Sequence, residues 1–296
     1  MSQYSTDALL ESMRMRGFLP EALGVSLEQI LRLMSEELGL YITSLLKGIR
    51  EEYLIATLDI TVTSGTVDIP PRAAGGALRT VTWLHSDGHR RELVRIEPEN
   101  RHEYGNSQGD PTGFMFQNNS LILLPAPTSG TIRLAYQQRP GTLVLESDCA
   151  EVTAINTGTS TVTVAAVPTA FDSAGPYDIV SATPNFTALA LDQSALSITT
   201  TTMQFASLPS GLAIGDFVCV ATQTCIPQMP YELATVLSQR TAYKIHEAAG
   251  SARAPAIAEG LRQAREDVIN LLSPRDDGAT RPIISRNGAG RRRGWW

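Results

Sequence analysis

Hydrophobic residues in the first third of the chain recur every three or four positions, a spacing that predicts helices. Leu9, Leu10 and Met13 indicate a short helix that ends before a stretch containing Gly17, Pro20 and Gly24. Ser26 then precedes a second periodic run, and Gln29 stands three residues later. This pair has the pattern of a capping box, in which each side chain bonds the other's backbone N–H.

The second run predicts a helix from about residue 27 to about residue 56, bent at Gly39 and Gly48. Its apolar positions are Leu27, Ile30, Leu31, Met34, Leu38, Tyr41, Ile42, Leu45, Leu46 and Ile49. These residues cover more than one stripe of a helix. We therefore expect the helix to pack against its own domain and also against a neighbouring molecule.

The period then changes to alternation, which is typical of strands with one buried face. Strands are predicted at residues 58–63, 67–69, 78–84, 93–96, 113–116, 120–124 and 131–136. From about residue 146 to about residue 226 the chain becomes rich in Thr, Ala and Val, with further short strands. This second β region predicts a small sandwich or barrel.

Helical periodicity returns after Pro230, with one helix from about residue 233 and another from about residue 257. We predict an α+β fold whose helical core is built from N-terminal (1–57) and C-terminal (227–273) helices. An antiparallel β domain (58–145) follows the first helices, a β-sandwich or barrel (146–226) is inserted after it, and an extended tail (274–296) ends the chain.

Charge is strongly segregated along this sequence, whose net charge is −6. No Lys or Arg occurs from Pro140 through Gln239, whereas residues 274–296 hold six arginines against two aspartates. Such separation favours electrostatic attraction between copies or with a partner, and it argues against a duplex-binding protein with a broad basic face. Six acidic residues of the cation-free stretch are candidates for contacts between subunits: Glu146, Asp148, Asp172, Asp178, Asp192 and Asp216.

The tail combines a flexible, glycine-rich approach with a cationic patch and an aromatic end. Its last residues are Arg291, Arg292, Arg293, Gly294, Trp295 and Trp296, and they include two of the three tryptophans of the chain. Tryptophan and arginine are frequent in interface hot spots, which predicts a tail that docks on a partner. A frayed terminus is the alternative.

The sequence offers little for catalysis or for binding a cofactor. Cys149, Cys219 and Cys225 match no zinc-ligand spacing and are expected to be reduced, buried thiols, as in a protein assembled in the cytoplasm. His85 and His89 flank a turn. They therefore do not lie on one face of a helix, as a metal-binding pair of histidines four residues apart would. We expect no enzyme activity, no metal and no cofactor.

Two features bear on the membrane. No apolar run approaches the roughly 18 residues that a membrane-spanning helix needs. The N-terminal residues lack the basic and apolar regions of a signal peptide. We therefore expect no membrane association.

Several ordered segments together resemble the head-to-tail adaptor (connector or head-completion) proteins of tailed bacteriophages. They are Arg-Glu-Glu-Tyr-Leu at 50–54, Ile-Pro-Pro-Arg-Ala-Ala-Gly-Gly-Ala-Leu-Arg at 69–79, Arg-Ile-Glu-Pro-Glu at 95–99, Leu-Ile-Leu-Leu-Pro-Ala-Pro at 121–127, Ile-Arg-Leu-Ala-Tyr-Gln-Gln-Arg-Pro at 132–140, Gly-Asp-Phe-Val-Cys-Val at 215–220, Ile-Pro-Gln-Met-Pro-Tyr-Glu-Leu at 226–233 and the Arg-rich Gly-Trp-Trp end. The resemblance extends from about residue 27 to the C-terminus.

This resemblance implies a structural virion protein in the neck, assembled in the host cytoplasm, that forms a homo-oligomeric ring of about a dozen copies below the portal. The implied partners are the portal protein, a tail or nozzle protein, and double-stranded DNA that passes without specific binding. Arg291, Arg292, Arg293, Trp295 and Trp296 would then dock on the portal, and the acidic residues would line the channel or the subunit contacts.

Two other functions are compatible with parts of the sequence. The Thr-rich inserted domain suggests a carbohydrate- or receptor-binding virion module, although it has no Trp and few aromatic rings to stack on sugars. The arginine tail suggests nonspecific nucleic-acid binding, which the acidic remainder of the chain disfavours.

Overall fold

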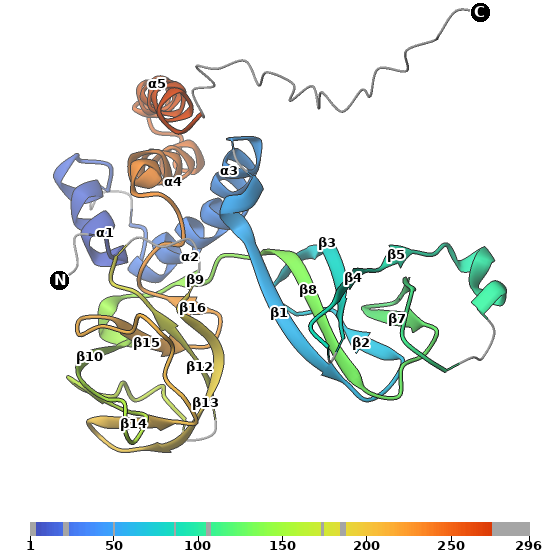
Figure 1. The fold of residues 1–296 in the computed structure, drawn as a ribbon. Helices are drawn as coiled ribbons and strands as arrows, with labels where there is room; N and C mark the ends of the chain where they lie inside the picture. The colour runs from blue at the N-terminus through green and yellow to red at the C-terminus, as the bar shows by residue number, and fades with distance from the viewer. Residues whose placement is uncertain are drawn as a thin grey trace, which may run out of the picture.

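The protein consists of a layer of helices above two separate β units (Figure 1). This computed structural model describes residues 4–19, 24–49, 51–85, 87–104, 108–172, 175–183 and 188–273. One β unit contains two four-stranded sheets that share a hydrophobic core, and we call it the β sandwich. The other is a closed six-stranded barrel. The predicted mixture of helices, antiparallel sheets and an additional small β unit is confirmed, and that unit is a barrel.

The N-terminal helices are α1 (Thr6–Met15) and a long helix made of α2 (Leu27–Glu37), a π-helical segment (Leu38–Ile42) and α3 (Thr43–Ile49). The capping box at Ser26 and Gln29 is present, with Ser26 Oγ accepting from the Gln29 N–H at 3.2 Å and Gln29 Oε1 accepting from the Ser26 N–H at 2.9 Å. The π-helical segment contains Gly39, one of the two predicted bends. There the hydroxyl of Thr43 donates to the Leu38 carbonyl at 2.9 Å.

The predicted end of this helix near residue 56 is wrong. The helix ends at Ile49, and a short 3-10 turn (Glu51–Leu54) leads directly into strand β1 (Ile55–Val62). β1 pairs with β8 (Gly130–Gln138) along its whole length, from Ile55 opposite Gln137 to Val62 opposite Gly130. The ladder provides partners for the backbone N–H and C=O groups of β1. These residues therefore pair as a strand and do not continue the helix.

The β sandwich contains eight strands. Its first sheet has the order β1, β8, β3 (Ala73–Leu84) and β4 (Arg90–Glu92). The second has the order β2 (Thr66–Asp68), β7 (Ser120–Leu124), β6 (Gly113–Gln117) and β5 (Val94–Arg95). β5 and β6 run parallel, and the 3-10 helix Pro98–Tyr104 lies between them in the sequence. Trp83, Leu121 and Leu134 belong to the core between the two sheets.

The barrel has the strand order β10 (Ala150–Asn156), β11 (Thr161–Val164), β14 (Thr202–Phe205), β13 (Ala190–Ile198), β12 (Pro176–Val180) and β15 (Phe217–Val220). Closure of β15 onto β10 removes the exposed edges of the sheet. Two short strands, β9 (Thr142–Leu143) and β16 (Gln223–Thr224), pair in parallel outside the barrel, between it and the helices (Figure 1).

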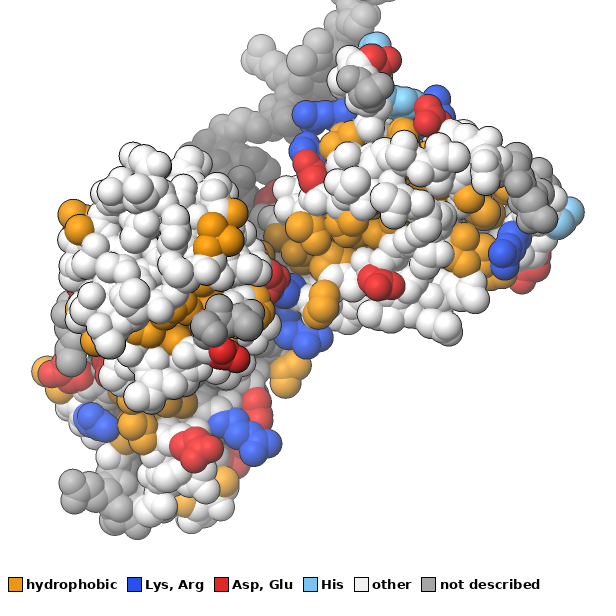
Figure 2. Space-filling model, turned by 90° about the horizontal axis from the view of Figure 1, so that it is seen from below, with side chains coloured by type: hydrophobic (Ala, Val, Ile, Leu, Met, Phe, Trp, Pro, Cys, Tyr) orange, Lys and Arg blue, Asp and Glu red, His pale blue; other side chains and the backbone are white. Residues whose placement is uncertain are grey.

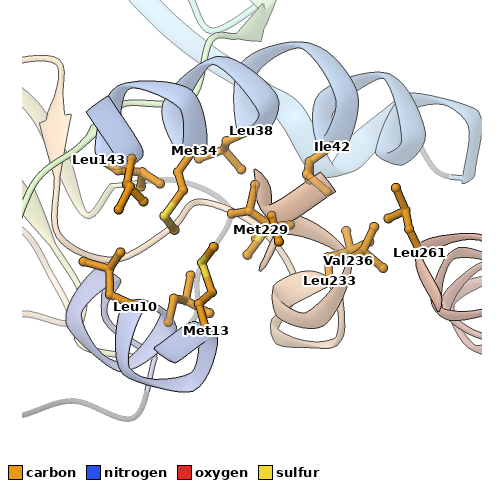
Figure 3. Packing of buried hydrophobic residues seen from close by; sticks show 14 of the residues in the cluster. Leu10, Met13, Met34, Leu38, Ile42, Leu143, Met229, Leu233, Val236 and Leu261 are labelled. Carbon is orange, nitrogen blue, oxygen red and sulfur yellow. The ribbon is translucent and has the colours of Figure 1, made fainter. Parts of the chain in front are cut away.

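The C-terminal helices are α4 (Ala234–Ala248), preceded by a 3-10 turn (Tyr231–Leu233), and α5 (Ala254–Leu272). Their buried residues belong to the same hydrophobic cluster as those of α1, α2 and α3. Figure 3 shows Met13 of α1, Met34 of α2 and Met229 meeting at the centre of this cluster. Flexible methionine side chains suit such a junction, because they fill irregular gaps between helices that cross at different angles.

A buried ion pair joins the two β units. Arg72, in the segment between β2 and β3, donates from Nη2 to Asp178 Oδ1 of β12 at 2.8 Å. The same guanidinium donates to both carboxylate oxygens of Asp192 in β13, at 2.7 and 2.9 Å. We call these three residues the Arg72 clamp. Arg72 thereby supplies a cation to the barrel, whose own residues lie in a stretch of sequence without Lys or Arg.

Asp178 is the buried end of the Arg72 clamp, since only 4% of its side chain is exposed, against 55% for Asp192. Asp178 also accepts hydrogen bonds from the backbone N–H groups of Asp192 at 3.0 Å and Thr222 at 2.9 Å. Burial raises the pKa of the Asp178 carboxyl above its usual value, and these hydrogen bonds and Arg72 offset part of the rise.

The close approach of Gly130 to Trp83 yields a first prediction. A Cβ atom at Gly130 would lie 2.1 Å from Cη2 of the buried Trp83 ring, so Gly130→Ala must displace the ring. We expect the free energy of unfolding to fall by about 1–3 kcal/mol, measured by urea denaturation followed by circular dichroism. Gly48→Ala is the control, because no atom lies within 4 Å of its Cβ position in exposed α3. That change should be neutral or stabilising by up to about 1 kcal/mol. Equal stability of the two variants would contradict the packing argument.

The Arg72 clamp yields a second prediction. Arg72→Met should lower the free energy of unfolding by about 3–5 kcal/mol at pH 7, because it leaves the Asp178 carboxylate buried without a cation. The folded-state pKa of Asp178 is raised, and it rises further without Arg72. The penalty should therefore shrink as the pH falls through that raised pKa, because Asp178 is then protonated in the folded variant and no carboxylate is left buried.

The measurement is urea denaturation of both proteins at pH 7 and near pH 4. Asp192→Asn is the matched control, because Asp192 is exposed and because Asn tolerates its left-handed backbone, with φ of 52°. The control should cost less than about 1 kcal/mol. A penalty for Arg72→Met that does not change with pH would show that Asp178 is not the group left uncompensated.

Candidate interaction surfaces

The residues predicted to dock on a partner, Arg291, Arg292, Arg293, Trp295 and Trp296, lie outside the described residues. Ser273, the last described residue, directly follows α5.

The six acidic candidates fall into two groups. Asp178 and Asp216 are each 3% exposed and have partners inside the chain. Asp216 accepts from the backbone N–H groups of Ala213 at 2.7 Å and Ala182 at 2.9 Å, which secures the loop before β15. Their role in the isolated chain is to satisfy buried polar groups of the barrel.

The other four acidic candidates reach the surface. Asp148, Asp172 and Asp192 are exposed, and Glu146 is half-buried. Asp192 is already engaged with Arg72. Asp148 accepts from the Leu145 N–H at 3.3 Å, and the Glu146 N–H donates to Asp7 of α1 at 2.8 Å. These bonds hold the 3-10 turn Glu146–Asp148 against the helical layer, at the point where the chain enters the barrel.

Apolar grooves flank the long helix on more than one side. A groove of about 670 Å³ lies between α2 and α4, with Val25, Leu33 and Ile245 on its walls. Arg32, Glu36, Lys244 and Glu247 line the same groove. A second groove, of about 310 Å³, lies between α3 and α5 and is lined by Tyr41, Leu45 and Ile269 among others. Leu40, on the π-helical segment, is 75% exposed.

The two β units present different surfaces from below. In Figure 2 the barrel is largely uncharged, and acidic and basic side chains gather in the crease between the barrel and the β sandwich. This crease has a volume of about 750 Å³ and is lined mainly by apolar residues from β1, the segment before β3 and the start of β13. Arg72 and Asp192 also line it. The role of Arg72 could not be predicted from the sequence, because its partners lie 106 and 120 residues away.

The described residues contain few groups arranged for chemistry. His85 Nδ1 lies 3.2 Å from Asp110 Oδ2 near the surface, and His246 Nε2 lies 3.2 Å from the Phe18 carbonyl. Within the described part of the chain, a single group of three or more His, Cys, Asp or Glu residues has its ligand atoms within 4.8 Å of one another. It consists of Cys149, Cys219 and Cys225, which are all buried, as was predicted for Cys219 and Cys225.

None of the helices that the structure describes combines the length and apolar character needed to span a bilayer.

Comparison with known proteins identifies the family. The model of the SU10 adaptor protein family matches residues 19–175, which is more than half of the chain. The matched region includes the long helix, the whole β sandwich and the first strands of the barrel. Among curated proteins, none matches this chain. The family match confirms the resemblance to phage head-to-tail adaptors that the ordered motifs indicate. The chain therefore belongs to the SU10 adaptor protein family and is a structural adaptor protein of a bacteriophage.

Proposed function

We propose that this protein forms a ring in the virion neck, docks on the portal through its C-terminal tail, and links the portal to the tail. The observation that carries the proposal is the match to the SU10 adaptor family across residues 19–175. Its partners are then the portal protein, a tail or nozzle protein, and further copies of itself, about twelve in the ring. Assembly takes place in the host cytoplasm.

The helical layer supports the proposed ring. A ring requires each copy to present two different surfaces that fit one another. The groove between α2 and α4 is largely apolar, the groove between α3 and α5 is mixed, and the two lie on different pairs of helices. The first groove is also lined by two ion pairs within the chain, Arg32 with Glu36 and Lys244 with Glu247, so it carries no net charge.

The tail supports portal docking. It carries a net charge of +4, whereas the rest of the chain carries −10. A basic tail with two indoles has the chemistry of an anchor for an acidic, grooved receptor. Each buried indole would contribute on the order of 2–4 kcal/mol, and repetition around a ring would multiply the effect through avidity.

The acidic surface supports passage of DNA without specific binding. Asp148 and Asp172 are exposed and belong to the stretch that lacks Lys and Arg. If this surface faces the channel, it repels phosphate and does not retain DNA. Asp178 and Asp216 are not part of this proposal, because they have buried partners within the chain.

The alternative of a carbohydrate-binding module gains no support from the described part of the barrel. Stacking on a sugar needs exposed aromatic rings. Tyr177, Phe205 and Phe217 are buried, and Phe171 is half-buried with its ring stacked on that of Tyr177. We therefore retain a single proposed function.

If the tail docks on the portal, its tryptophans and its arginines should contribute to binding in different ways. Trp295→Ala with Trp296→Ala should abolish binding of the ring to purified portal at moderate salt, because the apolar anchor is lost. Changing Arg291, Arg292 and Arg293 to Gln should weaken binding less and should reduce its salt dependence. Co-sedimentation with portal at several salt concentrations measures both effects. Undiminished binding after deletion of residues 290–296 would refute tail docking.

The ring proposal predicts that exposed apolar residues of the helical layer contribute to self-association. Leu40→Glu should shift the protein toward monomer in sedimentation velocity, because it places a charge on the exposed apolar surface of the helical layer. Leu196→Glu is the control, since Leu196 of β13 is similarly exposed, at 66% against 75%, and lies on the barrel. A shift caused by Leu196→Glu and not by Leu40→Glu would place the contact on the barrel.

A further inference from the structure

Three cysteines that are distant in the sequence meet at the base of the barrel. Cys149, Cys219 and Cys225 are all buried, and their Sγ atoms lie within 4.8 Å of one another. The Sγ atoms of Cys149 and Cys219 are 2.7 Å apart. Their neighbours are apolar and include Val180, Phe217 and Ile226.

The strand register places Cys149 opposite Cys219. β10 and β15 are antiparallel, with Ala150 opposite Val218 and Glu151 opposite Phe217, so the next pair in this register is Cys149 and Cys219. Directly opposed residues in such a pair have Cα atoms roughly 4.5–5.5 Å apart. This separation lies within the range that a disulfide accepts, roughly 4.4–6.8 Å.

The geometry favours a covalent bond over a metal site. Two thiolate sulfurs bound to one tetrahedral zinc ion, each about 2.3 Å from the metal, lie about 3.8 Å apart. The distance between Cys149 Sγ and Cys219 Sγ, 2.7 Å, is much shorter. Within the described residues, the cluster includes no fourth side-chain ligand. A zinc ion with three thiolates would also leave a net negative charge among apolar side chains, whereas a disulfide is neutral.

The three thiols differ in acidity. The hydrogen bond with Cys219 and burial raise the pKa of Cys149, and contacts with both other thiols raise the pKa of Cys225. Burial would raise the pKa of Cys219, but its contacts with Cys149 and Cys225 lower it overall. Burial disfavours the thiolate form at all three positions.

We propose that Cys149 and Cys219 form a disulfide when the protein meets a peroxide outside the reducing host cytoplasm. Hydrogen peroxide oxidises one thiol to a sulfenic acid and is itself reduced to water. The second thiol then displaces the hydroxyl as a second water, and the S–S bond forms. Two thiols and one peroxide thus give one disulfide and two waters.

The position of this bond gives it a defined structural role. The chain enters the barrel directly after Cys149, at β10, and leaves it at the end of β15, directly after Cys219. The two cysteines are 70 residues apart in the sequence, so the disulfide would enclose the whole barrel in one covalent loop. Such a loop restricts the unfolded chain and stabilises the enclosed fold.

Cys225 stays on the helical side of the cluster. Its carbonyl accepts from the Thr6 backbone N–H at 2.8 Å and from the Thr6 hydroxyl at 3.0 Å. These bonds fix the segment after β16 to the first residue of α1, and Cys225 has no place in the β10–β15 register. We assign it the role of the remaining free thiol.

The test compares full-length protein before and after treatment with hydrogen peroxide. The protein is then denatured, alkylated and mapped by mass spectrometry. Trypsin leaves the three cysteines in one peptide, because no Lys or Arg occurs from Pro140 through Gln239. Cleavage after Glu151 separates Cys149 from the other two. The expected result is a loss of about 2 Da, a cross-linked Cys149 peptide and a single alkylated cysteine.

Two variants assign the bond. Cys225→Ser should form the cross-link as the wild-type protein does, whereas Cys219→Ser should lose it. Oxidation should raise the thermal midpoint of the wild-type protein and of Cys225→Ser by on the order of 10 °C, and dithiothreitol should reverse the rise. If Cys219→Ser fails to fold, peptide mapping of the wild-type and Cys225→Ser proteins decides the assignment.

Three results would overturn the proposal. The first is three alkylated cysteines after peroxide treatment. The second is a cross-link that requires Cys225. The third is stoichiometric zinc in the protein as purified, measured by native mass spectrometry.

Discussion

The architecture depends on one hydrophobic core to which both ends of the described chain contribute. Residues of α1 and α2 pack with residues of α4 and α5 that follow about 200 positions later, with Met13, Met34 and Met229 at the junction. Arg240 of α4 adds a hydrogen bond to Glu37 of α2 at 2.8 Å and lies over the Tyr41 ring. Because this core brings the two ends of the described chain together, the chain between them leaves the helical layer and returns to it. It does so twice and forms one β unit each time.

The local features of this fold could be predicted from the sequence, since they depend on neighbouring residues. The capping box at Ser26, the helical periodicity behind it and the alternation that marks β1 and β8 are all local signals. The end of the long helix was not predictable in this way. It depends on the pairing of β1 with β8, whose partner residues lie more than 60 positions away.

The interactions between the units illustrate the same limit. A stretch of a hundred residues without Lys or Arg suggests an acidic surface, yet two of its aspartates are neutralised by Arg72 from the β sandwich. The cysteines likewise match no local motif, because strand register and not sequence spacing brings Cys149 to Cys219. In both cases the tertiary fold creates the site from residues that look unremarkable in isolation.

The contacts described above between the barrel and the rest of the molecule lie at one end of the barrel. Cys149, the β9–β16 pair and the Arg72 clamp all lie near the points where the chain enters and leaves it. The turn between β10 and β11 lies at the opposite end of β10, where Asn156, the last residue of β10, and Gly158 in the turn are exposed. Exposed loop tips of this kind usually accept inserted residues. A short epitope placed there would stand away from the helical layer and would mark, in an electron micrograph of an assembled particle, the direction in which the barrel points.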